Sequence, residues 1–277
     1  MPFTFSHPAA AVPLRPWFRH PHALSALVVG SIMPDLHLVL FGLVEREATH
    51  SLAGLLWFCL PGGLLVLALF HHLLKAPMAA VLTEAVRSRL ERSIQPARSG
   101  GPVGLVVLGL AVVVGAITHL ALDALTSPHP AVLAAWPGIR DPLFTVLGIH
   151  FRPNVVFQLT FSSAGLVLLV LWGRTWYRSQ GSGSSTEPRR GRSAAEARRV
   201  HLLRLFWGIA PSLWGLMMGI ALAAEKPTFK RIVATGVHEG FTHYVTALCV
   251  ALVVGALAWR GTTKAQRPKG NAKGDTG

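Results

Sequence analysis

The chain has 277 residues, of which 51% are hydrophobic and only 14% are charged. Soluble proteins carry about 25% charged residues, so this composition excludes an ordinary soluble domain. The formal net charge of +14 would suggest nucleic acid binding by a soluble protein, but here its placement along the chain matters more, and no nucleic-acid partner is expected. Cys59 and Cys249 both lie in apolar runs, so no disulfide framework is expected. The first five residues lack the basic start and apolar core of a signal peptide.

Six apolar runs come close to the length of about 20 residues that a helix needs to cross a bilayer. They cover residues 23–44, 52–74, 103–125, 155–176, 202–224 and 240–259. Met33-Pro34-Asp35 interrupts the first run, and proline removes a helix hydrogen bond, so this run is either one kinked span or a half-span that re-enters. The sequence therefore predicts an all-α fold, a polytopic transmembrane helical bundle of five or six spans.

The segments between the runs have distinct compositions. Residues 1–22 suggest a short helical or interfacial stretch, and the helical spacing of apolar and charged positions in residues 77–94 predicts an amphipathic interfacial helix. Residues 127–152 read as a long, proline-rich loop. We expect four parts: a membrane domain carrying a metal site (1–176), a flexible basic linker (177–200), two C-terminal transmembrane helices (201–260) and a disordered basic tail (261–277).

The distribution of lysine and arginine predicts the orientation in the membrane. With six spans, 20 of the 26 basic residues fall in the segments on the side of the termini, and 6 fall in the loops on the other side. The positive-inside rule then places both termini in the cytoplasm of a multi-pass cell-membrane protein. If the first run re-enters, only the N-terminus changes side.

Four polar residues fall near the outer ends of their segments in this topology. His119 and Asp123 are four residues apart, so they share one face of a helix. Asp35 lies within the first apolar run, and His50 lies in the short polar loop that follows this run. Imidazoles and carboxylates are costly inside a membrane and are the ligands that divalent zinc, manganese and iron accept. The alternatives are a His119–Asp123 hydrogen bond that only packs two helices, a helix cap by Asp35 and an ordinary loop histidine at position 50.

Other polar residues have simpler interpretations. His71 and His72 beside Lys75 are typical of an interfacial anchor. The pattern His238-Glu239…His243 stands at a helix start, where glutamate interacts favourably with the helix dipole. Their roles, and that of His129, stay open. The sequence contains no Gly-rich phosphate loop, CxxC pair, HExxH or GxSxG motif, so it gives no support to those enzyme classes.

Several motifs resemble a bacterial integral-membrane family known as domain of unknown function 4184. They occur in the family's order, cover about residues 1–175 well and the rest loosely, and read Pro2-Phe3-Thr4-Phe5-Ser6-His7-Pro8, Gly30-Ser31-Ile32-Met33-Pro34-Asp35, Thr49-His50-Ser51-Leu52, Leu60-Pro61-Gly62-Gly63, and Gly115-Ala116-Ile117-Thr118-His119 through Asp123 to Thr126. The chain departs from the family pattern at Cys59, where the family often has aspartate, and at Ser127, where it often has histidine; His129 follows two residues later.

The resemblance extends distantly to inner-membrane metal-dependent hydrolases similar to zinc phospholipase C and P1-type nucleases. It implies a divalent metal, with zinc as the first choice, and five ligand candidates: His7, Asp35, His50, His119 and Asp123. The expected function is hydrolysis of a lipid-borne ester or phosphoester at the outer face, with Asp35 or Asp123 as general base. The rivals are a transporter or channel with a His/Asp proton or ion relay, for which the sequence shows no inverted repeat, and a non-catalytic scaffold.

Overall fold

A computed structural model describes residues 4–40, 43–94, 101–126, 130–146, 149–180, 193–224 and 229–265. The α-helices are α1 (Pro8–Ala11), α2 (Ala23–Ile32), α3 (Arg46–Thr49), α4 (Leu52–Gly54), α5 (Leu60–Leu69), α6 (Lys75–Val81), α7 (Glu84–Ile94), α8 (Gly101–Thr126), α9 (Pro130–Ala135), α10 (Pro153–Ser179), α11 (Ala194–Ala224) and α12 (Phe229–Ala265). Shorter 3₁₀ segments cover Thr4–Ser6, Val12–Trp17, Met33–Leu40 and Pro137–Arg140, and π-helical turns cover Leu55–Cys59 and Phe70–Leu74.

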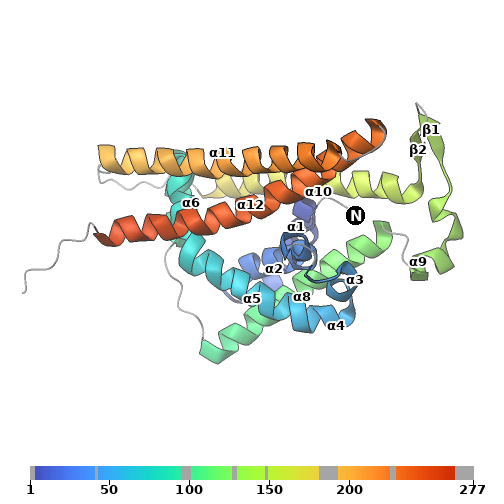
Figure 1. Ribbon diagram of the computed structural model, residues 1–277. Helices are drawn as coiled ribbons and strands as arrows, with labels where there is room; N and C mark the ends of the chain where they lie inside the picture. Colours follow the sequence, from blue (N-terminus) through green and yellow to red (C-terminus); the bar gives the residue numbers. More distant parts are fainter. Residues whose placement is uncertain are drawn as a thin grey trace, which may run out of the picture. The chain divides into compact units, whose positions relative to one another are not determined.

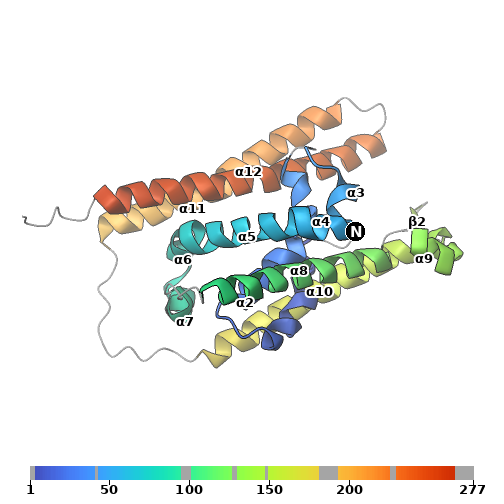
Figure 2. The ribbon, with the colours of Figure 1, turned by 90° about the horizontal axis from the view of Figure 1, so that it is seen from below.

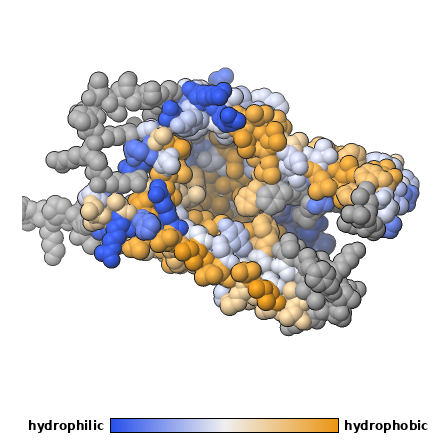
Figure 3. Space-filling model, turned by 90° about the horizontal axis from the view of Figure 1, so that it is seen from above, coloured by the Kyte–Doolittle hydropathy of each residue, from blue (hydrophilic) through white to orange (hydrophobic). Residues whose placement is uncertain are grey.

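The helices confirm the expected all-α, multi-pass architecture. Within the residues that the structure describes, six helical segments are long and apolar enough to cross a membrane: Ala23–Leu40, Leu52–Val81, Gly101–Thr126, Pro153–Ser179, Ala194–Ala224 and Glu239–Thr262. Large hydrophobic side chains lie exposed along these segments, for example Leu105 on α8, Leu168 on α10 and Leu216 on α11. Figure 3 shows long hydrophobic stretches on one face of the molecule. Such surfaces are stable against lipid and not against water.

The chain forms two compact units, residues 1–71 with 88–184 and residues 72–87 with 185–277. In the second unit, α11 and α12 run antiparallel side by side (Figure 1). Trp207 Nε1 donates a hydrogen bond of 2.9 Å to the Ala251 carbonyl across this pair. Residues 181–192 of the expected linker and 266–277 of the expected tail lie outside the described residues.

In the first unit, α2 packs against α8 and α5, and Figure 2 shows α5 and α8 lying next to one another. Glycines allow this close packing. A Cβ atom at Gly30 would collide with the Val112 carbonyl, and one at Gly115 would collide with the Leu27 carbonyl. The backbones of α2 and α8 therefore touch directly. This contact fixes the position of α2 along the axis of α8.

The first apolar run changes geometry at its proline. α2 ends at Ile32, and a 3₁₀ segment carries the chain on from Met33 to Leu40. Pro34 has no amide hydrogen to donate, which removes one α-helical hydrogen bond at this point. Asp35 follows directly and is 4% exposed. The interruption thus turns a carboxylate into the interior of the first unit.

Two segments differ from the sequence-based boundaries. The second span runs on through α6 to Val81, and the separate helix α7 begins only at Glu84. The expected long loop contains α9 and a β-hairpin, in which β1 (Phe144–Val146) pairs antiparallel with β2 (Ile149–Phe151). The pair is formed by aromatic and β-branched residues, and the rings of Phe144 and Phe151 stack at 5.0 Å.

Candidate metal centre

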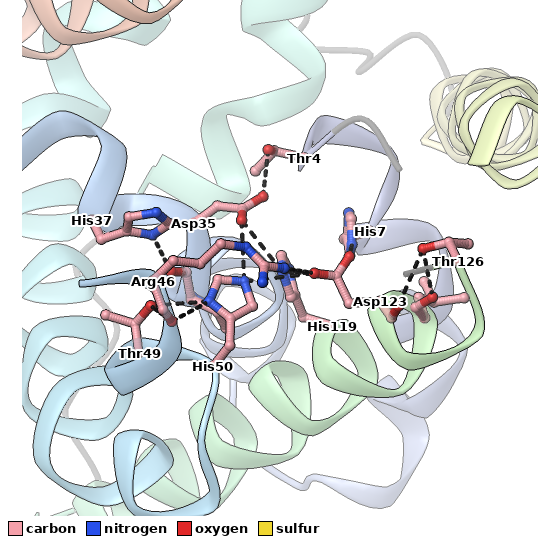
Figure 4. Close-up of polar contacts among 12 residues, drawn as sticks. Thr4, His7, Asp35, His37, Arg46, Thr49, His50, His119, Asp123 and Thr126 are labelled. Atoms are coloured by element: carbon pink, nitrogen blue, oxygen red, sulfur yellow. Dashed lines mark hydrogen bonds and ion pairs between the residues drawn. The ribbon is translucent and has the colours of Figure 1, made fainter. Parts of the chain in front are cut away.

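Four separate elements of the first unit bring five polar side chains together (Figure 4). His7 lies between the first 3₁₀ segment and α1, and Asp35 lies in the 3₁₀ segment after α2. His50 directly follows α3, and His119 and Asp123 lie one turn apart on α8. All are largely buried: His7 and His119 are fully buried, and Asp35 and Asp123 are 4% and 5% exposed.

Helix α10 helps to hold the N-terminal segment in place. A Cβ atom at Gly165 of α10 would lie 2.9 Å from the Ser6 carbonyl oxygen, so the two backbones are in direct contact. His7 follows at once, and its ring stacks on that of His119 with centroids 3.9 Å apart. The N-terminal segment therefore reaches the cluster through packing against α10 and α8.

The imidazole nitrogens and carboxylate oxygens of the cluster face one another. The Oδ1 atom of Asp35 lies 3.4 Å from Nε2 of His50 and 3.6 Å from Nε2 of His119. The Oδ2 atom of Asp123 lies 3.6 Å from Nε2 of His50 and 3.9 Å from Nε2 of His119, and its Oδ1 atom lies 3.6 Å from Nε2 of His7. The His119–Asp123 distance is too long for a hydrogen bond, so a simple packing bond between them does not describe the pair.

Backbone carbonyls orient two of the imidazoles. Nδ1 of His119 donates to the Ser31 carbonyl across the α2–α8 contact at 2.8 Å. Nδ1 of His50 lies 3.1 Å from the Arg46 carbonyl and 3.0 Å from Oγ1 of Thr49. A proton on Nδ1 leaves the lone pair of Nε2 free to face the carboxylates. In known metal sites, a hydrogen bond from the ring nitrogen that does not bind the metal fixes the orientation of the histidine.

The hydroxyl groups next to the histidines act differently from one another. Thr49 is buried, and its hydroxyl bonds to the Arg46 carbonyl at 3.0 Å as well as contacting His50. Thr118 instead donates to the Gly115 carbonyl at 2.7 Å, within its own helix. For His119 the orienting group is therefore the Ser31 carbonyl.

Two sets of these residues could hold a metal ion, His7 with His119 and Asp123, and Asp35 with His50 and His119. The ligand atoms in each set lie within 4.8 Å of one another. Two ligands at about 2.1 Å from a tetrahedral ion are about 3.4 Å apart, close to the distances from Asp35 to His50 and His119. Among the residues that the structure describes, Nε2 of both histidines and Oδ1 of Asp35 are buried and make no hydrogen bond. Buried polar atoms normally have partners, so this donor set suits a bound cation.

Two contacts at the cluster were not predicted from the sequence. Oγ1 of Thr4 donates a 2.6 Å hydrogen bond to Oδ2 of Asp35. Nη2 of Arg46 lies 2.6 Å from Oδ2 of Asp123. Both residues lie near a predicted ligand in the sequence, Thr4 before His7 and Arg46 before His50, but no periodicity marks either one.

The remaining candidates do not join this cluster or lie outside the described part. His129 and Ser127 lie outside the described residues, as does the side chain of His238. Glu239 and His243 belong to the second unit. Cys59 is fully buried, with Sγ 3.9 Å from the Thr49 carbonyl, and belongs to neither candidate ligand set. His71 lies against the His22 ring at 3.8 Å.

Membrane-length helices and a buried His/Asp cluster define a helical, multi-pass membrane protein with a polar centre among its spans. The chain belongs to the family described as Domain of unknown function (DUF4184), whose model matches residues 1–258. The match covers every residue of the cluster, and it continues through the second unit to a point within α12. No curated protein and no solved structure showed a significant match.

Proposed function

We propose that the protein is a metal-dependent hydrolase of the cell membrane that cleaves a lipid-borne ester or phosphoester at the outer face. The observation that carries this proposal is the convergence of three Nε2 atoms and two carboxylates in one buried cluster (Figure 4). We propose zinc as the ion, because catalytic zinc sites are built from histidines and carboxylates of this kind.

The ligand set we favour is Asp35, His50 and His119. A single Nε2 lone pair binds one ion, and His119 occurs in both candidate sets, so they describe alternative positions for one ion. Asp123 is already paired with the guanidinium of Arg46 at 2.6 Å, which disfavours a second cation on that carboxylate. Two histidines and one carboxylate leave a coordination position open for water, as in catalytic zinc sites.

Asp123 is then the carboxylate left to act as general base. Its Oδ2 atom lies 3.6 Å from Nε2 of His50, beside the proposed ligand set. A bound divalent ion would lower the pKa of a water molecule and polarise the scissile group. Asp123 would accept a proton from the attacking water molecule while the oxygen of that water forms a bond to the phosphorus or acyl carbon. The ester bond would then break, and the proton held by Asp123 would pass to the leaving alcohol.

The orientation of the site follows from the loop charges. The cluster gathers at the ends of the spans that adjoin the poorly basic side of the chain, with His50 just before the second span and Asp123 near the end of α8. The positive-inside rule places that side outside the cell. Because the ring of His7 stacks on that of His119, this placement puts the N-terminal segment on the outer side, which is the alternative to a cytoplasmic N-terminus. An epitope inserted within residues 181–192 should be protected from externally added antibody on intact cells. An epitope inserted at Asp141 should be accessible, and the reverse pattern would contradict the proposed outer-face site.

The hydrolase proposal is tested by activity on defined lipids. Detergent-purified protein is assayed with a fluorogenic phospholipid and a fluorogenic carboxylic ester lipid, before and after chelation and after zinc or manganese is restored. We expect chelator-sensitive cleavage that returns with metal. Asp123→Asn should keep the metal and lose most of the turnover, because a missing general base typically costs about 10²–10⁴ in rate. A metal-loaded wild type that cleaves neither lipid would contradict the hydrolase proposal.

A further inference from the structure

Arg46 is the cationic side chain at the edge of the candidate metal centre. Its Nη2 atom lies 2.6 Å from Oδ2 of Asp123. Its side chain is 36% exposed, whereas that of Asp123 is 7% exposed. The Arg46 side chain is therefore the more accessible member of this ion pair, and a group that enters from the surroundings can reach it.

The backbone of Arg46 is tied to the metal centre. Its carbonyl oxygen lies 3.1 Å from Nδ1 of His50 and accepts a 3.0 Å hydrogen bond from Oγ1 of Thr49. The single turn α3 (Arg46–Thr49) thus presents both the guanidinium and, at its end, the imidazole of a proposed ligand. These bonds hold the backbone of Arg46 in place, whereas its side chain is long enough to exchange one partner for another.

The charges of the cluster favour an anion once a metal is bound. The two carboxylates and one guanidinium carry one net negative charge when the imidazoles are neutral. A divalent ion reverses this to one net positive charge. A carboxylic ester is neutral and gains little from such a centre, whereas a phosphoester carries a negative charge. The planar guanidinium fork binds phosphate oxygens in pairs, as it binds a carboxylate.

We propose that Arg46 is the phosphate anchor of this site and selects phosphoesters over carboxylic esters. In the substrate-free centre the guanidinium pairs with Asp123. When substrate enters, the guanidinium leaves this carboxylate and binds two oxygens of the phosphate group. The exchange also releases Asp123 from its ion pair, which leaves the carboxylate able to accept a proton. This inference rests on the proposed function, since the position of the phosphate depends on a metal held by Asp35, His50 and His119.

The test measures cobalt binding and phosphate binding separately on detergent-purified full-length protein. Wild type, Arg46→Gln, Arg46→Lys and the control Arg140→Gln are loaded with Co²⁺ and then titrated with inorganic phosphate by calorimetry. Arg140 is exposed and lies in the 3₁₀ segment before the β-hairpin. We expect Arg46→Gln to bind cobalt at least as tightly as wild type, because a competing cation is gone. Its phosphate Kd should rise about tenfold to a hundredfold.

The phosphate Kd of Arg46→Lys should lie between those of wild type and Arg46→Gln, because lysine keeps the positive charge but cannot bind two phosphate oxygens with a planar guanidinium. Arg140→Gln should match wild type. Phosphate binding by both Arg46 variants within about twofold of wild type, with cobalt retained, would overturn the anchor and leave the metal site intact. Loss of cobalt from Arg46→Gln would show that Arg46 only supports the ligands. Failure of wild type to bind cobalt would overturn the proposed function and the anchor together.

Competition experiments separate the two sources of a phosphate group. Phosphatidate in mixed micelles and glycerol 3-phosphate in solution are each added to the phosphate-saturated, cobalt-loaded wild type. Displacement by phosphatidate alone assigns a lipid substrate, and displacement by glycerol 3-phosphate alone assigns a soluble one; either result supports the anchor. Displacement by neither compound would contradict a phosphoester substrate.

Discussion

Nδ1 of His119 on α8 donates a 2.8 Å hydrogen bond to the backbone carbonyl of Ser31 on α2. The bond crosses the α2–α8 contact and sets the direction in which Nε2 of His119 points. Ser31 directly follows Gly30, and His119 follows Gly115 by one turn, and a Cβ atom at either glycine would collide with the facing backbone. The orientation of a candidate ligand thus depends on the close packing of two helices.

Gly115→Ala tests this dependence. The added methyl group would meet the Leu27 carbonyl, so the helices must separate, and overpacking of this kind typically costs about 1–3 kcal/mol. We expect a lower thermal midpoint in detergent. We also expect reduced metal occupancy, because the separation of the helices breaks the hydrogen bond from His119 to the Ser31 carbonyl. Gly173→Ala on α10 is the matched control, since nothing lies within 4 Å of a Cβ atom there. Equal midpoints and metal contents for the two variants would show that the α2–α8 contact does not set the site.

Thr4→Val tests the support of Asp35. The substitution keeps the shape of the side chain and removes the hydroxyl that donates 2.6 Å to Oδ2 of Asp35. Loss of a hydrogen bond behind a metal ligand typically lowers metal affinity about 10–100-fold, and we expect a decrease in that range by competition with a chelating dye. Thr145→Val is the control, because that hydroxyl bonds to the exposed His150. If the two variants had the same metal affinity, the Thr4 contact would have no part in metal binding.

Ser51→Ala separates stability from metal binding. Ser51 caps the start of the second span by accepting a 2.9 Å hydrogen bond from the Gly54 amide. Removal of an N-cap costs about 1 kcal/mol, so the thermal midpoint should fall. Ser51 supplies no atom to either candidate ligand set, and the metal-to-protein ratio should stay at the wild-type value. Ser179→Ala at the exposed end of α10 should change neither quantity. A Ser51→Ala protein that keeps its midpoint would show that the cap is dispensable.

Hydropathy was sufficient to predict the helical architecture, because each span must be a long apolar helix whatever its neighbours are. Hydropathy does not predict the hairpin at Phe144–Phe151, which depends on a short cross-strand pairing in a proline-rich segment. It also missed the extension of the second span to Val81, since Lys75 suggests an earlier end. Local composition therefore predicts that an element forms more reliably than it predicts the residues at which the element begins and ends.

The candidate site likewise contains some residues that the sequence predicts and others that it does not. Loop charges placed Asp35, His50, His119 and Asp123 on one side of the membrane, and the structure brings all four together. His7 was implied only by the family resemblance, because a histidine in a short N-terminal segment has no periodic pattern. The contacts of Arg46 and Thr4 require the tertiary packing of α3 and of the N-terminal segment, which no local spacing encodes.

The central claim is that Asp35, His50 and His119 hold a divalent metal ion. It is tested most directly by the metal-to-protein ratio of detergent-purified wild type and His119→Ala, grown with zinc and manganese and measured side by side by elemental analysis. His150→Ala, which removes an exposed imidazole bonded to Thr145, is the control for adventitious binding. We expect about one ion per chain in wild type and in His150→Ala, and little or none in a folded His119→Ala. No metal in the wild type, or an equal ratio in wild type and His119→Ala, would contradict it.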